Sequence, residues 1–558
     1  MGGLEIAGSE NWASGSGPAL LRPVVEVNGH PVDFGASGMA WERSNSWLPT
    51  FACRSGDLAI HGTLFCPVGR DADMPGLVYL LSLENRGGAA MELTCAMTGV
   101  LGSREVRVRS GRPVGDSHRV HQFQELVLLE GDTHPGLVTL ALGGDGEVQV
   151  RTGDDASFEL LRTLSLAPGQ RADVAFYLTA APERDGAAST AIAMRKRGWA
   201  SLLGSTRQAL ESVEQETGVD WLDRLVNRNV CFAYFYGVGR ALDDGHFYLV
   251  RSRAPWSSYG MTTRDWEALM WTLPAIQLVD APLARELLLR AFEVHGYDPG
   301  RGVNYADGTM FTPGFSLEGL CSYPLALDRY IRDTGDDRIL ENLVVGDTLF
   351  SVAEQLESRK HGRFDLYSTD VEPDGESPEY PYTTHGNAVA ASALDVLRRT
   401  LDEEYAFTLT DPESVRNAVL QHLVRRGAGG AEALVAAADL AGHQAGDRSP
   451  SGSLYWVSSF DLVGREDEIY RRTCRELAEA ADPSAPRALV RELARLYGPD
   501  GEEVMRWLRR APLDAGFAAE FVDAEGRMVS GGGDAALAGL LAYTVWYALN
   551  AMGIGGQP

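Results

Sequence analysis

Lysine is almost absent from this sequence of 558 residues. Only Lys196 and Lys360 occur, in Met-Arg-Lys-Arg-Gly and Ser-Arg-Lys-His-Gly. Enzymes that form a Schiff base, or that bind phosphate through a P-loop, need a desolvated or phosphate-contacting ammonium group. Both lysines instead have the flanking residues of solvated basic patches. Lysine-dependent reactions are therefore poor candidates, and carboxylate chemistry becomes the better one.

Paired or clustered cysteines are also lacking. The six cysteines are Cys53, Cys66, Cys95, Cys231, Cys321 and Cys474, with no CxxC pair and no tight grouping with histidine. This spacing disfavours a structural zinc site and a disulfide scaffold and fits a reducing compartment. The first residues lack a basic region followed by an apolar core, so we expect a cytoplasmic protein without a membrane anchor. No metal or other cofactor is expected.

Positive charge is in deficit overall. Acidic residues outnumber basic ones 77 to 50, which gives a formal net charge of −27. Such a surface repels phosphate backbones and anionic lipids, so neither nucleic acid nor a membrane is expected as a partner, whereas homo-oligomer formation is left open. The uncharged stretch 535–557 contains Thr544 and Asn550 and is less apolar than lipid requires, which favours a buried helix.

The first third of the chain alternates apolar and polar residues between turn residues, from about residue 24 to 181. Examples are DLAIHGTLF, GLVYLLSLENRG, GLVTLALGG and ADVAFYLTA. This period-two pattern predicts a large antiparallel β-sandwich, which we assign to residues 1–186. Residues 187–219 are expected to form a helical linker.

From residue 220 onward the apolar period is 3.6, and helical segments recur in pairs. The expected helices include 220–242, 263–278, 281–295, 317–334, 338–357, 386–403, 412–425, 432–441, 454–480, 485–496, 502–510 and 534–552. Segments 386–397 and 534–552 are apolar on nearly all sides and must be enclosed by other helices. The pattern predicts a two-layer helical barrel over residues 220–558, with a pocket lined by loops at one end.

Aromatic side chains lie beside carboxylates in three segments, 253–267, 370–387 and 514–526. Aromatic rings stack on the C–H faces of sugars, carboxylates bond their hydroxyls, and two carboxyl groups can perform the proton transfers of glycoside hydrolysis. The segments therefore predict a carbohydrate site, although core aromatics and solvated loop acids are the alternative interpretation. The candidate substrate-binding residues here are Trp256, Tyr259, Arg264, Trp266, Tyr382, His385 and Asn387. Trp456 fits a sugar platform or the helical core equally well.

Five stretches of the expected barrel follow one another in a recognisable order. They are TTRDWEALMWTLPAI, ARELLLRAFEVHG, FSLEGLCSYPLALDRYIRDTGD, THGNAVAASALDVL and GFAAEFVDAEGRMVSGGGDAALAGLLAYTVWYAL. Their order resembles the six-hairpin glycosidases, in particular the amylo-α-1,6-glucosidase part of glycogen-debranching enzymes and, less closely, bacterial glucoamylases of glycoside hydrolase family 15. The resemblance implies an (α/α)6 barrel after a sandwich and hydrolysis that inverts the anomeric centre.

The resemblance also implies roles for individual carboxylates. Asp265 matches the general acid of the debranching enzymes, and Glu520 matches the late general base of both families. Glu318 matches an acidic position that bonds sugar hydroxyls. Two observations limit these matches. His385 stands where the debranching pattern has a carboxylate. Glucoamylases place their general acid in the loop that in this chain contains Glu376 and Glu379. Glu379 is therefore the rival general acid.

The sequence as a whole favours an inverting exo-type glycoside hydrolase. Its substrate is expected to be a small neutral glycoside or oligosaccharide with an α-glucosidic or related linkage, because an acidic rim disfavours uronates and sulfated sugars. One alternative is a phosphorylase or lyase built on the same barrel. Another is a carbohydrate-binding protein without catalysis, which the histidine at position 385 keeps open.

Overall fold

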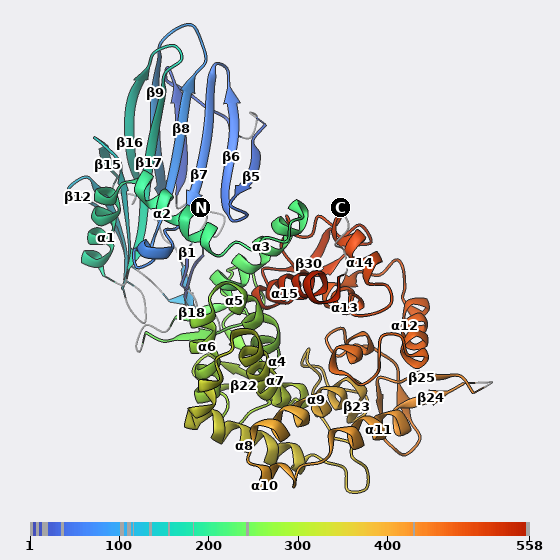
Figure 1. The fold of residues 1–558 in the computed structure, drawn as a ribbon. Coiled ribbons are helices and arrows are strands. Elements are labelled where there is room, and N and C mark those ends of the chain that lie inside the picture. Colours follow the sequence, from blue (N-terminus) through green and yellow to red (C-terminus); the bar gives the residue numbers. More distant parts are fainter. Residues whose placement is uncertain are drawn as a thin grey trace. The chain divides into compact units, whose positions relative to one another are not determined.

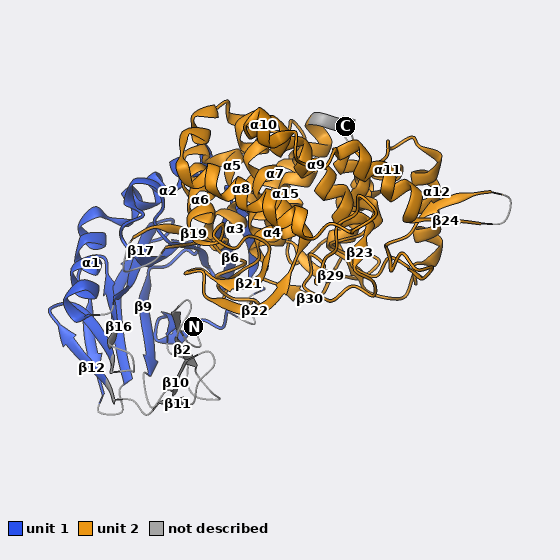
Figure 2. Cartoon of the chain, turned by 90° about the horizontal axis from the view of Figure 1, so that it is seen from below, with its two compact units in different colours: residues 1–214 blue, residues 215–558 orange. Residues whose placement is uncertain are grey.

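The computed structural model describes residues 4–6, 10–13, 21–34, 38–100, 105–108, 113–114, 117–132, 137–153, 157–181, 183–240, 245–427 and 430–553. The chain divides into two compact units, residues 1–214 and 215–558 (Figures 1 and 2). The helices expected as a linker are α1 (Arg184–Arg197) and α2 (Trp199–Ser212). Both lie within the first unit, and α1 packs against its strands.

The first unit contains antiparallel sheets, as the alternating pattern predicts. An eight-stranded sheet has the order β12 (Ser117–Phe123), β13 (Leu126–Asp132), β14 (Leu137–Gly144), β17 (Arg171–Ala181), β8 (Gly76–Asn85), β7 (Leu58–Phe65), β6 (Leu48–Ser55), β5 (Ala40–Ser44). A five-stranded sheet has the order β15 (Gln149–Thr152), β16 (Ser157–Leu166), β9 (Met91–Val100), β3 (Arg22–Val27), β4 (His30–Pro31). A smaller sheet joins β1 (Leu4–Ile6), β2 (Glu10–Ala13), β10 (Glu105–Val108) and β11 (Pro113–Val114).

The two larger sheets share one hydrophobic core. Ile60 and Phe176 of the eight-stranded sheet belong to the same buried cluster as Val25 and Leu160 of the five-stranded sheet. Successive residues of a strand point to opposite faces, so the alternating residues of each strand supply this core from one face. Helix α1 forms a second cluster with the eight-stranded sheet through Ala187 and Leu128.

The second unit is mainly helical. Its main helices are α3 (Asp220–Tyr236), α4 (Asp265–Glu267), α5 (Leu273–Val279), α6 (Ala281–Val294), α7 (Leu317–Thr334), α8 (Leu343–Ser358), α9 (Thr384–Thr400), α11 (Pro412–His422), α12 (Glu468–Ala480), α13 (Leu489–Arg495), α14 (Gly501–Leu508) and α15 (Ala535–Met552). A π-helical turn, η2 (Ala268–Thr272), joins α4 to α5, and the 3-10 helix η4 is Leu454–Phe460.

Two of the expected helices were wrong. Residues 432–441 instead form the short strands β25 (Glu432–Leu434) and β26 (Ala437–Ala438), because backbone pairing with β24 (Val424–Arg426) and β23 (Tyr382–Thr383) outweighs the helix propensity of their alanines. The expected helix 454–480 is broken after η4, where Asp461 adopts the left-handed conformation with φ 52°. No helix among the described residues is long and apolar enough to cross a membrane.

Helices of the second unit neighbour one another in a closed order. Turn η2 packs against α7, α7 against α9, α9 against η4, η4 against α13, α13 against α15, and α15 against η2. Helices α6, α8, α11, α12 and α14 each pack against one or more members of this set. Figure 2 shows the short strands β21 (Arg301–Tyr305), β22 (Met310–Phe315), β23, β29 (Ala519–Val522) and β30 (Met528–Gly532) along one side of the unit.

Candidate active site

The N-terminal ends of four helices carry polar residues, three of which the sequence singles out. Asp265 is the first residue of α4, Glu318 and His385 are the second residues of α7 and α9, and Asp534 is the N-cap of α15. Side chains of Ser316, Thr383 and Asp534 accept amide hydrogens in the first turns of α7, α9 and α15 and so mark where these helices begin. The short strands and the connecting loops supply the remaining residues of the site.

Glu318 and His385 form a buried pair. Glu318 Oε1 lies 3.0 Å from His385 Nδ1, and the two side chains are 1% and 2% exposed. The second polar atom of each, Glu318 Oε2 and His385 Nε2, is buried without a hydrogen-bond partner among the described residues. Leaving buried polar atoms unpaired costs about 1–3 kcal/mol each. The pair therefore has one acceptor and one ring nitrogen available for ligand hydroxyls.

Arg251 joins the starts of α4 and α15. Its Nη1 donates to Glu267 Oε1 at 2.8 Å, and its Nη2 and Nε donate to Asp534 Oδ2 at 2.9 and 3.2 Å. Asp534 in turn accepts the amide hydrogens of Ala536 and Leu537. Burial raises the pKa of Glu267, and the charges of Arg251 and Arg264 oppose that rise. The arginine thus holds two buried carboxylates in place.

Glu520 is attached to this network through Tyr259. The phenol oxygen of Tyr259 lies 3.0 Å from both carboxylate oxygens of Glu520, and the guanidinium carbon of Arg251 lies 3.3 Å from the centre of the Tyr259 ring. Burial raises the pKa of Tyr259 to about 12, so its hydroxyl stays a hydrogen-bond donor. A single phenol therefore positions the carboxylate that the sequence predicts as the base.

The acidic loop before α9 folds against Arg264. Arg264 Nη1 donates to the carbonyl oxygen of Asp374, and the Ser449 hydroxyl donates to Asp374 Oδ2 at 2.6 Å. Glu372 of the same loop is half-buried, and its pKa is raised to about 7, mainly by burial. The negative charges of Asp374, Glu318 and Asp447 also raise this pKa, whereas a hydrogen bond from Ser449 lowers it. Glu372 thus joins the network as a carboxyl group that is protonated near neutral pH.

Asp265 is buried, with 5% of its surface exposed. Its Oδ2 accepts the amide hydrogen of Gly300 at 2.9 Å, and it lines a small cavity with Leu249, Leu269 and His295. Burial raises its pKa to about 7, and the Gly300 amide opposes that rise. The pKa suits a general acid, and the groups beside this carboxyl come from the turn after α6 and from α7.

The remaining residues of the acidic loop and of α9 lie apart from this network. Glu379 is 43% exposed and lies 3.3 Å from Arg448. Tyr382 packs edge-on against His361. Asn387 is fully buried, and its amide bonds to backbone atoms of Tyr367 and Thr383. Asn387 therefore fixes the turn before the loop to helix α9.

The three candidate tryptophans occupy different places. Trp256 packs against Phe232 and Tyr236 and leaves much of its ring exposed. Trp266 is buried edge-on to His385, and its Nε1 has no partner among the described residues. Trp456 is buried beside Tyr497 and lines a pocket away from the helix N-termini. Trp256 is thus the exposed one of the three, and Trp266 and Trp456 are buried.

Several residues of the network were missed by the sequence reading. They are Arg251, Glu267, Glu372, Asp374, Ser449 and Asp534. For Glu267 and Asp534 a signal exists, because both lie in apolar helix starts where an acidic residue must find a buried partner. The partner, Arg251, is 283 residues from Asp534 and could not be paired with it by spacing. No cluster of three His, Cys, Asp or Glu side chains arranged like metal ligands occurs in the described part of the chain.

Comparison with solved structures places the fold. The chain is similar to a bacterial glucoamylase complexed with acarbose (TM-score 0.62, 10% identity, covering 96% of this chain and 88% of that one). It is also similar to a protein proposed to be a kojibiose phosphorylase from the human microbiome (TM-score 0.57, 10% identity, 95% and 79% covered). A metal-independent α-mannosidase from Streptococcus pneumoniae, in a non-productive complex with α-1,6-mannobiose, matches 62% of this chain and 97% of its own (TM-score 0.51, 12% identity).

No family model matches the sequence, and no curated protein matches it significantly. At 10–12% identity the structural likenesses establish the fold and leave the activity open. An N-terminal region of antiparallel sheets followed by a helical unit is the arrangement that this chain shares with the glucoamylase. None of the three matched chains is a debranching enzyme, the family with which the sequence shares the stronger resemblance.

Proposed function

We propose that the protein is an inverting, exo-acting glycoside hydrolase whose helical unit is an (α/α)6 barrel. The closed order of helix neighbours supports the barrel, with η2, α7, α9, η4, α13 and α15 as the inner ring. The observation that supports the activity is the buried polar cluster at the N-terminal ends of those helices. There Glu318 Oε2, His385 Nε2 and Trp266 Nε1 have no partner among the described residues, as sugar-binding groups require.

Glu520 is the proposed general base. Its carboxylate accepts from Tyr259, and the Tyr259 ring rests on Arg251, so its orientation is fixed before substrate binds. A base held in this way can take a proton from water on one face of a sugar ring while an acid protonates the leaving oxygen on the other. Exposed Trp256 is the proposed platform for the sugar face.

Two carboxyl groups with a pKa of about 7 fit the general acid. Asp265 is the acid that the sequence resemblance implies, and Glu372 is the one that the structure adds. A chain of contacts runs from Glu520 through Tyr259, Arg251, Glu267, Arg264, Asp374 and Ser449 to Glu372. Asp265 lies outside this chain of contacts, bonded to Gly300.

The substrate that this site fits is a small neutral α-glucoside or oligosaccharide. The carboxylates of Glu318, Asp374 and Glu520 repel anionic sugars, whereas hydroxyl groups can donate to them. The fold neighbours include one protein with acarbose and one with mannobiose bound, which is consistent with a neutral sugar.

A leaving-group experiment tests the proposal and separates the acids. Hydrolysis of maltose and of α-glucosyl fluoride is measured for Asp265→Asn, Glu372→Gln, Glu379→Gln and Glu520→Gln. Fluoride departs without protonation, so the acid variant loses about 10²–10⁴-fold on maltose and far less on the fluoride, whereas the base variant loses on both. If no variant shows this selective loss, or if Glu520→Gln keeps its activity and turnover requires phosphate, hydrolysis by this pair is wrong.

A further inference from the structure

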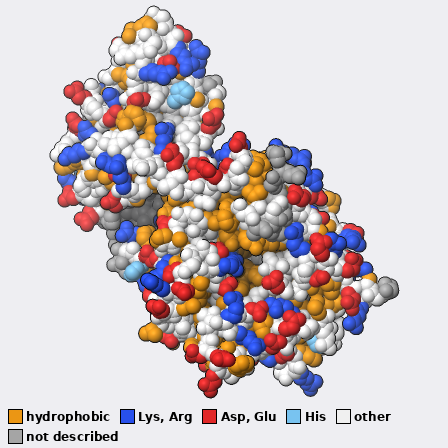
Figure 3. All heavy atoms as spheres, in the orientation of Figure 1, with side chains coloured by type: hydrophobic (Ala, Val, Ile, Leu, Met, Phe, Trp, Pro, Cys, Tyr) orange, Lys and Arg blue, Asp and Glu red, His pale blue; other side chains and the backbone are white. Residues whose placement is uncertain are grey.

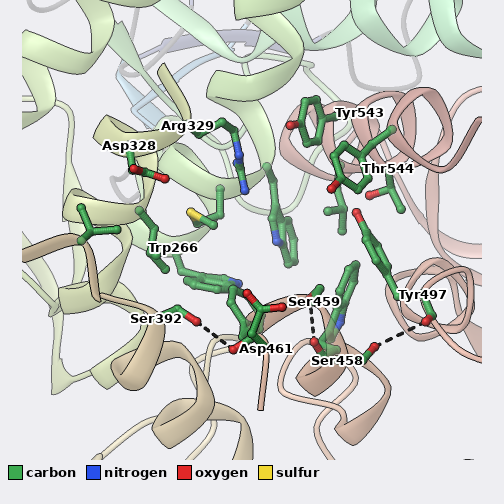
Figure 4. A pocket seen from close by; sticks show the side chains of 18 of the residues that line it. Trp266, Asp328, Arg329, Ser392, Ser458, Ser459, Asp461, Tyr497, Tyr543 and Thr544 are labelled. Atoms are coloured by element: carbon green, nitrogen blue, oxygen red, sulfur yellow. Dashed lines mark hydrogen bonds between the residues drawn. The ribbon is translucent and has the colours of Figure 1, made fainter. Parts of the chain in front are cut away.

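The helical unit contains a second, separate pocket of about 760 Å³. Its walls come from the later halves of α7 and α9, the middle of α15, η2, η4 and the segments that follow η4 and α13. Figure 4 shows Arg329 extending from α7 toward the middle of the pocket, with Tyr543, Tyr497 and Trp266 around it. This volume is that of a typical small-molecule site.

The pocket lies at the opposite end of the helices from the candidate active site. Helices α7 and α9 run in the same direction, because Glu318 meets His385 near their starts and Arg399 bonds Asp328 at 3.0 Å near their ends. From Glu318 to Arg329 is eleven residues, or about 16 Å along the helix axis. Trp266 and Phe460 lie between the two sites, since both contact the His385 ring and both line the pocket.

The pocket exists because two neighbouring elements are short. Helices α7, α9 and α15 have 17 or 18 residues, whereas η4 and α13 have 7 each. A helix of 18 residues is about 27 Å long, whereas α13 is about 10 Å long and the 3-10 helix η4 about 14 Å, so two members of the closed set of helices end early. The space beside the long helices is left to the side chains of Trp456, Tyr497 and Tyr543. Figure 3 shows hydrophobic side chains gathered near the middle of this unit.

Four arginines (Arg329, Arg332, Arg399 and Arg465) and three aspartates (Asp328, Asp395 and Asp461) line the pocket, so positive charge is in slight excess there. Asp328 bonds Arg399 and lies 3.5 Å from Arg332, and Asp395 pairs with Arg416. Arg329 has no ion pair or hydrogen bond among the described residues, its Nη1 is buried, and its guanidinium lies 5.1 Å from the centre of the Tyr543 ring. Arg329 is half-buried, and a partly desolvated guanidinium without a carboxylate partner binds a carboxylate or phosphate strongly.

Arg465 is the second cation of the pocket without a carboxylate partner. Its Nη2 donates to the Gly498 carbonyl at 2.8 Å, and its Nε is buried without a partner among the described residues. Tyr497 and Tyr547 stack with centroids 6.1 Å apart, and Trp456 lies 5.3 Å from Tyr497. Stacked rings of this kind present flat faces to the C–H groups of a sugar.

We infer that this pocket binds an anionic saccharide, a sugar bearing a phosphate or carboxylate, with its anionic group on Arg329 and its ring on the tyrosines. The inference concerns binding at this pocket and does not depend on the reaction at the other end of the helices. Because Trp266 and Trp456 line the pocket, occupancy should change tryptophan fluorescence.

Titrations of the full-length protein with glucose 6-phosphate, glucuronate, glucose and inorganic phosphate test this inference. Fluorescence and calorimetry should show binding of one or both anionic sugars at least 10-fold tighter than binding of glucose or of inorganic phosphate alone. Arg329→Met should weaken it at least 10-fold, whereas Arg332→Met, which removes a charge already paired with aspartate, should change it less than 3-fold. The inference would be overturned if glucose and glucose 6-phosphate bind equally, or if neither anionic sugar binds up to millimolar concentrations. It would also be overturned if Arg329→Met, with a wild-type circular dichroism spectrum, binds the anionic sugars as tightly as the wild type.

Discussion

Glu318 and His385 meet at the first turns of α7 and α9, with 3.0 Å between Glu318 Oε1 and His385 Nδ1, and each has a second polar atom buried without a partner in the described structure. The debranching pattern has a carboxylate where His385 stands. Two carboxylates at this separation would repel each other, whereas an imidazole can donate to Glu318. Glu318 therefore stays buried, with a histidine as its partner where the debranching pattern has a second carboxylate.

The first prediction concerns this pair. Glu318→Gln should lower kcat/KM by about 10–100-fold, because a charge-assisted hydrogen bond to a sugar hydroxyl contributes about 1.5–3 kcal/mol. Steady-state kinetics on maltose measures the effect, with Glu354→Gln on the exposed side of α8 as the matched control. If both variants behave like the wild type, Glu318 does not contact the substrate.

A second prediction uses two glycines with the same backbone conformation. Gly531 (φ 73°) would place a Cβ 2.3 Å from the Glu520 Cβ, whereas a Cβ at Gly335 (φ 71°) meets nothing within 4 Å. Gly531→Ala and Gly335→Ala should each lose about 1 kcal/mol of stability from backbone strain. Only Gly531→Ala should also lower kcat, by at least 10-fold, because it displaces the base. Equal activities of the two variants would show that the position of Glu520 does not matter.

A third prediction concerns pH. The pKa of Asp265 is raised to about 7 by burial, so between pH 4 and 7 the folded protein holds a proton that the unfolded chain has lost. The free energy of unfolding should therefore decrease as pH rises through this window. Thermal unfolding of Asp265→Asn, measured at pH 5 and pH 8, should show a smaller decrease in Tm than the wild type. An unchanged pH dependence would mean that Asp265 titrates normally.

The raised pKa values of Asp265 and Glu372 also predict the pH dependence of turnover. A general acid must be protonated, so kcat/KM should fall above about pH 7 as Asp265 or Glu372 loses its proton. The variant that removes the acid should lose this alkaline limb from its residual activity on maltose, whose leaving group needs protonation, and the other variant should keep it. A limb that persists in both variants would assign the acid to a third group.

A fourth prediction tests the Arg251 network. Arg251→Met leaves buried Asp534 without its cation and Glu267 with only the more distant Arg264, and should cost about 3–5 kcal/mol of stability. Arg301→Met breaks an exposed ion pair with Asp298 and should cost less than about 1 kcal/mol. Urea unfolding followed by tryptophan fluorescence compares the two variants. Similar losses in both would contradict the structural role of Arg251.

Much of the fold could be predicted from periodicity, and the exceptions have physical causes. The sequence limits of α7 match the prediction, because apolar spacing, the Ser316 cap and the left-handed Gly335 all mark its ends. The prediction failed for residues 432–441, because their alanines favour a helix. Their strand conformation depends on pairing with segments such as β23, about 50 residues earlier, which the local sequence does not show.

The candidate site was only partly predictable. Glu318 and Glu520 were singled out through the family resemblance and His385 as a departure from it, and the structure links Glu318 to His385 and Glu520 to Tyr259. Glu372 and Glu379 belong to one acidic loop, and only the folded chain distinguishes the inward carboxyl from the one beside exposed Arg448. Arg251 gave no signal, since its partners lie 16 and 283 residues away.

Proton NMR of the first sugar released from an α-glucoside tests the central claim most directly. Because an inverting hydrolase delivers water to the face opposite the leaving group, β-glucose should appear first and then mutarotate to the α form. The signal should be absent with Glu520→Gln at equal protein concentration. Initial formation of α-glucose, or of a sugar 1-phosphate in phosphate buffer without free glucose, would contradict the account.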